Sequence, residues 1–168
     1  MRKVLIIDDE PEVAAFMAAL VETELGFAPV VACSEETALD SISSFDYDLI
    51  ISDTLSFRPH LPTERGGDRW QWLDLLSKQL RMRHSNVPVL MMTSYPREVY
   101  STYAAHGLLG VIRKPFDIQE TIKAILEAIM AHPDFNQRDH QFRFTSIFAR
   151  KEAVRLHLDQ NFFSPLAF

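Results

Sequence analysis

Three acidic residues follow two short apolar runs, in a pattern that could bind a cation. Asp8 and Asp9 come directly after the run 3–7, and Asp53 comes just after the run 49–51. Carboxylates gathered at one place repel each other, and a hard divalent cation with oxygen ligands, such as Mg²⁺, removes that repulsion. If these runs are neighbouring strands, the sequence predicts a magnesium site.

Two further strand-end residues supply groups that would suit a phosphoryl ligand. Thr93 and Ser94 follow the apolar run 87–92, and Lys114 stands shortly after Val111 and Ile112. A lysine ammonium and a threonine hydroxyl can pair with the anionic oxygens of a phosphoryl group. Together with the acids, they favour phosphoryl chemistry.

The apolar pattern predicts the elements that position these residues. Strands are expected over 3–7, 29–32, 49–51, 87–92 and 111–112, with helices from Pro11 to Gly26, after Ser34, over 70–80 and 97–105, and after Asp117. Strands that alternate with helices predict an α/β fold, a five-stranded parallel sheet with helices on both faces. Ligands of such sheets bind at the carboxyl ends of the strands, where the candidate residues stand.

Four residues outside the candidate site also receive predictions of burial. Phe16, Phe45 and Ile118 fall on the apolar stripes of their helices, so they are expected to face the core. Cys33 is the one cysteine, so it forms no intramolecular disulfide, and it is expected to be a small buried residue.

Composition and charge exclude several classes of protein. The 168 residues are 47% hydrophobic and 24% charged, which is typical of a globular domain and not of a disordered or fibrous chain. A net charge of −6 argues against direct binding to nucleic acid or to an anionic membrane. The first apolar run stops at Asp8, whereas a secretory signal needs roughly 7 to 15 apolar residues. We therefore expect a cytoplasmic protein.

The order of these residues at successive strand ends resembles the receiver (CheY-like) domain of two-component response regulators. The resemblance covers residues 1 to about 130 and is carried by Asp8-Asp9, Asp53, Thr93-Ser94 and Lys114-Pro115. It implies a flavodoxin-like, doubly wound sheet with the strand order 2-1-3-4-5. It also implies a cis bond before Pro115.

The resemblance implies a role for each acid. Asp53 would be the nucleophile that accepts a phosphoryl group from a sensor histidine kinase or a phosphotransfer protein. Asp8, Asp9 and Asp53 would hold Mg²⁺, and the main-chain carbonyl of Leu55 would be a further ligand.

The resemblance also implies a role for Thr93 and Lys114, each of which would contact a phosphoryl oxygen. It implies a signalling phosphoacceptor rather than an enzyme, one that promotes the phosphorylation and dephosphorylation of its own aspartate. Two features depart from the family pattern. The segment 54–67 is longer than the usual loop, and Val111 stands where many receivers have an aromatic switch residue.

Residues 131–168 form a separate extension that contains seven of the twelve phenylalanines, with a helix predicted over about 145–158. Its aromatic content favours packing, dimerisation or partner binding, and homodimerisation is the leading hypothesis. The extension is too short for a helix-turn-helix output domain. We therefore expect no DNA-binding domain and signalling through contacts with a downstream protein.

Two alternatives remain open. A pseudo-receiver adaptor would share the fold without being phosphorylated, and would act through the long loop and the extension, but such proteins usually lack one of the acids or the lysine. A phosphatase of the haloacid dehalogenase type also has an aspartate nucleophile after a strand. That class needs a second aspartate two residues later, where this chain has Leu55.

Overall fold

The computed structural model describes residues 1–53, 71–83, 85–94 and 108–131, which all lie within one compact unit, Met1–Phe135. The elements in chain order are β1 (Lys3–Ile7), α1 (Pro11–Leu25), β2 (Ala28–Ala32), α2 (Glu35–Ser44), β3 (Leu49–Asp53), α3 (Gln71–Met82), β4 (Val89–Thr93), β5 (Gly110–Arg113) and α5 (Ile118–Met130). Each strand and helix that the apolar pattern predicts within the described residues is present.

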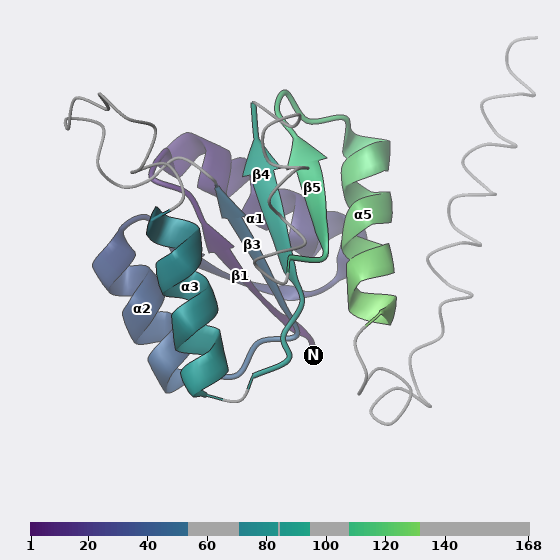
Figure 1. The fold of residues 1–168 in the computed structure, drawn as a ribbon. Helices are drawn as coiled ribbons and strands as arrows, with labels where there is room; N and C mark the ends of the chain where they lie inside the picture. The colour runs from purple at the N-terminus through teal and green to yellow at the C-terminus, as the bar shows by residue number, and fades with distance from the viewer. Residues whose placement is uncertain (54–70, 84, 95–107, 132–168) are drawn as a thin grey trace, which may run out of the picture. The chain divides into compact units, whose positions relative to one another are not determined.

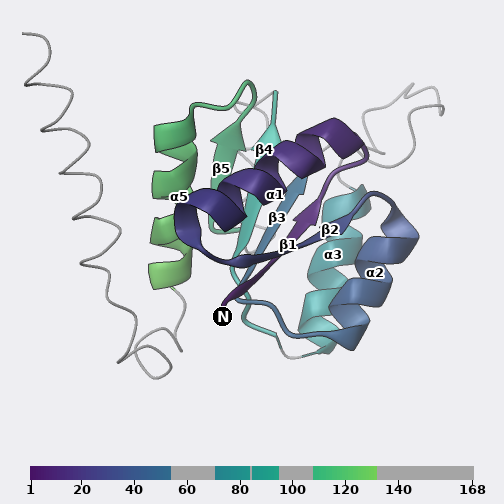
Figure 2. The same cartoon turned by 180° about the vertical axis from the view of Figure 1, so that it is seen from behind.

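The five strands form one parallel sheet in the order β2-β1-β3-β4-β5. Helices α1 and α5 cover one face, and α2 and α3 cover the other (Figures 1 and 2). This arrangement confirms the predicted α/β fold and its strand order. All strands run the same way, so their carboxyl ends meet at one edge of the sheet.

The core lies on both faces of the three central strands. Strands β3 and β4 are buried at every position, and β1 is buried from its second residue. The edge strand β2 is only partly covered. A central strand between two helical layers has no solvated side, which explains why these segments are continuous apolar runs rather than alternating ones.

Local signals fix where the helices begin and end. Helix α1 begins at Pro11 and is ended by Gly26, whose φ of 66° is a left-handed conformation that suits glycine. Ser34 caps α2, where its hydroxyl accepts the Thr37 N–H. Asp117 caps α5 by accepting the Glu120 N–H.

Four predictions of burial were wrong, since all four side chains are exposed. Phe45 follows the last turn of α2, where the Lys3 ammonium lies 5.5 Å from its ring centroid. Ile118 is the first residue of α5, and the first buried residue of that helix is Thr121. Phe16 stacks on Phe116 at 5.6 Å between centroids instead of entering the core. Cys33 lies in the connection after β2, at the edge of the sheet.

Several predictions lie outside the described residues. They concern the segment 54–67, the Leu55 carbonyl, the helix 97–105, and the extension beyond residue 131 with its helix over 145–158. Among the residues that are described, no helix combines the length and the apolar character needed to cross a membrane.

Candidate functional site

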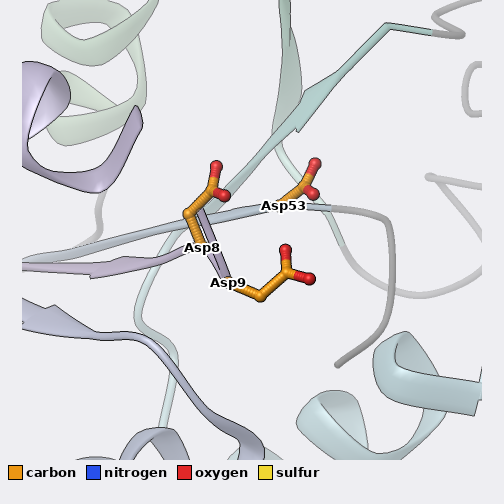
Figure 3. Close-up of side chains that lie close together, drawn as sticks. All are labelled: Asp8, Asp9 and Asp53. Carbon is orange, nitrogen blue, oxygen red and sulfur yellow. The ribbon is translucent and has the colours of Figure 1, made fainter. Parts of the chain in front are cut away.

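The structure brings the three predicted acids together at the carboxyl edge of the sheet. Asp8, Asp9 and Asp53 each offer a carboxylate oxygen, and these oxygens all lie within 4.8 Å of one another. Their side chains converge from the ends of β1 and β3 (Figure 3). The cause is the parallel register, which pairs Ile7 with Ser52 and so places the next residue of each strand at the same level.

The three acids differ in their surroundings. Asp8 and Asp53 are buried, whereas Asp9 is exposed. Asp8 is held through both oxygens, because Oδ1 accepts the Glu10 N–H at 3.0 Å and Oδ2 accepts a hydrogen bond from Lys114 Nζ at 2.9 Å. A carboxylate fixed in this way has its position set by the protein, while Asp9 remains open to a ligand from solvent.

Lys114 reaches the acids from the end of β5, which lies two strands from β3 in the sheet. Its Nζ lies 2.9 Å from Asp8 Oδ2, 3.4 Å from Asp53 Oδ1 and 4.0 Å from Glu10 Oε1. Its main-chain N–H donates to the Thr93 carbonyl at 2.8 Å, and its peptide bond to Pro115 is cis. The ammonium therefore stands beside the candidate nucleophile, as the sequence predicts.

The electrostatic surroundings shift two pKa values upward. Burial raises the pKa of Asp9, and the nearby Asp8 charge raises it further. A backbone hydrogen bond of Asp9 and the Lys114 charge lower this pKa, but by less. Burial alone would lower the pKa of Lys114, but the hydrogen bond to Asp8 and the charges of Asp53 and Asp8 outweigh burial and raise it. Lys114 therefore stays charged, and Asp9 binds a proton more readily than an isolated aspartate.

Thr93 lies at the same edge as the acids. It is the last residue of β4, it is buried, and β4 pairs with β3 so that Met92 stands opposite Asp53. Thr93 therefore extends one residue past the level of the candidate nucleophile, next to the β5 residue Arg113 in register. This is the place that the sequence predicts for it.

Three residues near the site were not predicted from the sequence. Glu10 lies near Lys114, and Ser52 and Trp72 form a buried hydrogen bond beneath Asp53. The sequence held one signal for Ser52, which is a polar residue near the end of an otherwise apolar strand. Its partner Trp72 comes after residues 54–70, so sequence spacing alone does not pair the two residues.

Asparagine at position 9 should slightly stabilise the Mg²⁺-free protein. The folded-state pKa of Asp9 is raised, so its charged form costs more in the folded than in the unfolded state. Because Asp9 is exposed, solvent screens this cost, and the gain should be at most about 0.5 kcal/mol. The gain should disappear as the pH falls below 3.8, the ordinary pKa, where the carboxyl is neutral in both states.

The same Asp9→Asn variant tests Asp9 as a metal ligand. Thermal unfolding with and without Mg²⁺ should show a rise in Tm for the wild type and little or none for the variant, since a ligand stabilises only the state that binds it. An equal rise in both proteins would contradict a role for Asp9 in holding the ion.

Similarities to known proteins agree with this geometry. The family model of the response regulator receiver domain matches residues 4–126. The chain is 30% identical over 139 residues to the transcriptional regulatory protein CpxR of Escherichia coli, which is 82% of this chain and 53% of CpxR. It is 26% identical over 161 residues to the response regulator ArlR of Staphylococcus saprophyticus, 95% of this chain and 64% of ArlR. The chain thus spans about half the length of the first relative and less than two thirds of the second.

Solved structures show the same fold. The receiver domain of a Francisella response regulator has a TM-score of 0.61 and 27% identity, over 77% of this chain and 98% of that one. The response regulator TrrA of Thermotoga maritima, solved in complex with Mg²⁺-BeF, has a TM-score of 0.60 and 21% identity, over 76% and 99% of the two chains.

Proposed function

The chain belongs to the response regulator receiver domain family, and from this we propose that it is a signalling phosphoacceptor whose acceptor residue is Asp53. The observation that carries the proposal is the meeting of Asp8, Asp9 and Asp53 with the Lys114 ammonium at one edge of the sheet. A histidine kinase or a phosphotransfer protein would supply the phosphoryl group.

The proposed transfer is a displacement at phosphorus. A carboxylate oxygen of Asp53 forms the new O–P bond as the N–P bond to the partner's histidine breaks, and the electron pair of the broken bond stays on the imidazole nitrogen. Lys114 Nζ, 3.4 Å from Asp53 Oδ1, would attract a phosphoryl oxygen. The Thr93 hydroxyl would donate to another, which distinguishes the phosphorylated from the free state.

The acids fit Mg²⁺. They offer hard oxygen ligands within 4.8 Å of one another. Burial and, to a smaller extent, the Asp8 charge raise the pKa of Asp9, and a bound cation would favour its charged form. Asp9 and Asp53 would be ligands, with Asp8 helping to hold the ion and the Leu55 carbonyl adding another ligand. When bound, Mg²⁺ would neutralise the charge that develops on the transferred group.

The chain is proposed to pass on its signal by protein contacts, in the cytoplasm. A net charge of −6 opposes direct contact with nucleic acid, so the receiver, residues 1–130, would act on a downstream protein target. Residues 131–168 are proposed as an extension that packs on the receiver, on a second copy or on a partner, with homodimerisation favoured. Light scattering of the full chain, with and without a phosphodonor, tests the homodimer.

The experiment that tests the function is intact-mass measurement after incubation with acetyl phosphate. We expect one phosphoryl increment when Mg²⁺ is present and none when it is chelated, because the acids would otherwise repel the donor. No increment from acetyl phosphate or from a kinase donor, with Mg²⁺ present, would favour the pseudo-receiver adaptor.

A further inference from the structure

Two hydrogen bonds link helix α3 to the main chain of Asp53. Trp72 Nε1 donates to Ser52 Oγ at 2.9 Å, and Ser52 Oγ donates to the Asp53 carbonyl oxygen at 3.1 Å. All three residues are buried. The donor in each bond is known. An indole N–H can only donate, so Ser52 Oγ accepts from it and gives its single proton to the Asp53 carbonyl oxygen.

The indole is itself held in place by the core. Trp72 belongs to the apolar cluster between the sheet and helices α2 and α3, with Ile50, Leu73 and Leu76. A large ring packed on all sides has few rotamers open to it, so its N–H points in a constant direction. The two hydrogen bonds therefore connect the main chain of Asp53, the last residue of β3, to a rigidly packed part of the core.

These hydrogen bonds join residues that flank one segment of the sequence. Residues 54–70 lie between Asp53 and Gln71, and the Trp72–Ser52 bond links the residues before that segment to those after it. The Asp53 carbonyl is thus held by hydrogen bonds that lead to the core. Fixing this peptide group limits rotation at Asp53 and keeps its carboxylate near Lys114 Nζ, 3.4 Å away.

We propose that Trp72 and Ser52 are positioning residues for phosphoryl transfer to Asp53. The proposal rests on the proposed function, and it adds residues that touch neither the phosphoryl group nor Mg²⁺. Transfer in line requires the nucleophile within a narrow range of positions, and a displacement of about 1 Å can lower a rate about 100-fold. Supporting hydrogen bonds beneath such a residue keep it within that range.

Conservative variants test the two positions in the full chain. Ser52→Ala removes the hydroxyl and Trp72→Phe removes the indole N–H, whereas Ser52→Thr keeps a hydroxyl and should rescue. Ser77→Ala is the control for loss of a buried serine hydroxyl, since Ser77 is a buried serine of α3 and neither the Trp72–Ser52 nor the Ser52–Asp53 hydrogen bond involves it. The rate constant of phosphorylation by acetyl phosphate is measured at saturating Mg²⁺, where circular dichroism shows each protein folded.

Loss of positioning should appear as a lower rate per folded molecule. We expect Ser52→Ala and Trp72→Phe each to lower the rate constant about 3- to 30-fold, a smaller effect than a full 1 Å displacement. The rate constant of the double variant should be within about twofold of that of the slower single variant, because both substitutions remove hydrogen bonds of the same Trp72–Ser52–Asp53 series. Ser52→Thr and Ser77→Ala should stay within about twofold of the wild type.

A purely structural role gives a different result. Rate constants of Ser52→Ala and Trp72→Phe within twofold of the wild type, with only a lower Tm, would overturn the proposal. Failure of the proposed function is a separate outcome, in which the wild type itself takes up no phosphoryl group. In that case the fluorescence emission of Trp72 is measured during Mg²⁺ titration, in a Trp70→Phe background. The emission should change as Mg²⁺ binds, and Ser52→Ala should weaken that change. No change in emission would overturn the positioning role.

Discussion

Replacing Asp53 by asparagine should lower phosphoryl uptake from acetyl phosphate or a kinase at least about 100-fold, to the limit of detection. Asparagine has nearly the same size as aspartate but carries no negative charge, and its amide is a far weaker nucleophile than a carboxylate. Asp53 is buried and lies 3.4 Å from Lys114 Nζ. The other buried acid beside Lys114 is Asp8, whose two oxygens accept from the Glu10 N–H and from Lys114. Intact mass after incubation with the donor and Mg²⁺ measures the loss.

The control for Asp53→Asn is the exposed acid Asp46, which pairs with Arg83 on the surface at 3.3 Å. Asp46→Asn should take up the phosphoryl group at the wild-type rate, because a surface pair of this kind contributes little. Uptake by Asp53→Asn at more than about a tenth of the wild-type rate would contradict Asp53 as the acceptor.

Replacing Lys114 by methionine should destabilise the Mg²⁺-free protein by about 2–4 kcal/mol. The ammonium is mostly buried and pairs with the buried carboxylates of Asp8 and Asp53, so its loss leaves their charges without a cationic partner. Mg²⁺ should restore more stability to this variant than to the wild type, since it brings positive charge to the same acids. Chemical denaturation with and without Mg²⁺ measures both effects.

The surface lysine Lys123 is the matched control for Lys114. Its ion pair with Glu127 spans 3.8 Å, and both side chains are largely exposed. Lys123→Met should therefore change the free energy of unfolding by less than about 0.5 kcal/mol. Equal losses from Lys114→Met and Lys123→Met would show that Lys114 does not neutralise the acids.

The sheet and the acidic site could be predicted because their signals are local. Buried strands are short apolar runs, and a parallel sheet brings the residue after each run to one edge, so Asp8, Asp53 and Thr93 could be placed together from the sequence alone. Lys114 could be added because it follows the last short run, and the structure confirms that it reaches the acids.

The remaining features depend on tertiary packing. Phe16 and Ile118 have helical spacing, but periodicity does not tell how far the covering layer extends, and both are exposed. The bond between Trp72 and Ser52 depends on how α3 packs against the sheet, so neither residue type nor spacing shows it. The residues that hold the site in place were therefore harder to predict than those that form it.

The identity of the acceptor is tested most directly by trapping the phosphorylated residue. Borohydride reduces an aspartyl phosphate to homoserine, so the full chain is phosphorylated with acetyl phosphate and Mg²⁺, reduced, digested and mapped by mass spectrometry. We expect homoserine at position 53 in the wild type and no conversion when Mg²⁺ is chelated. Conversion at a different aspartate, with Asp53 intact, would contradict Asp53 as the acceptor.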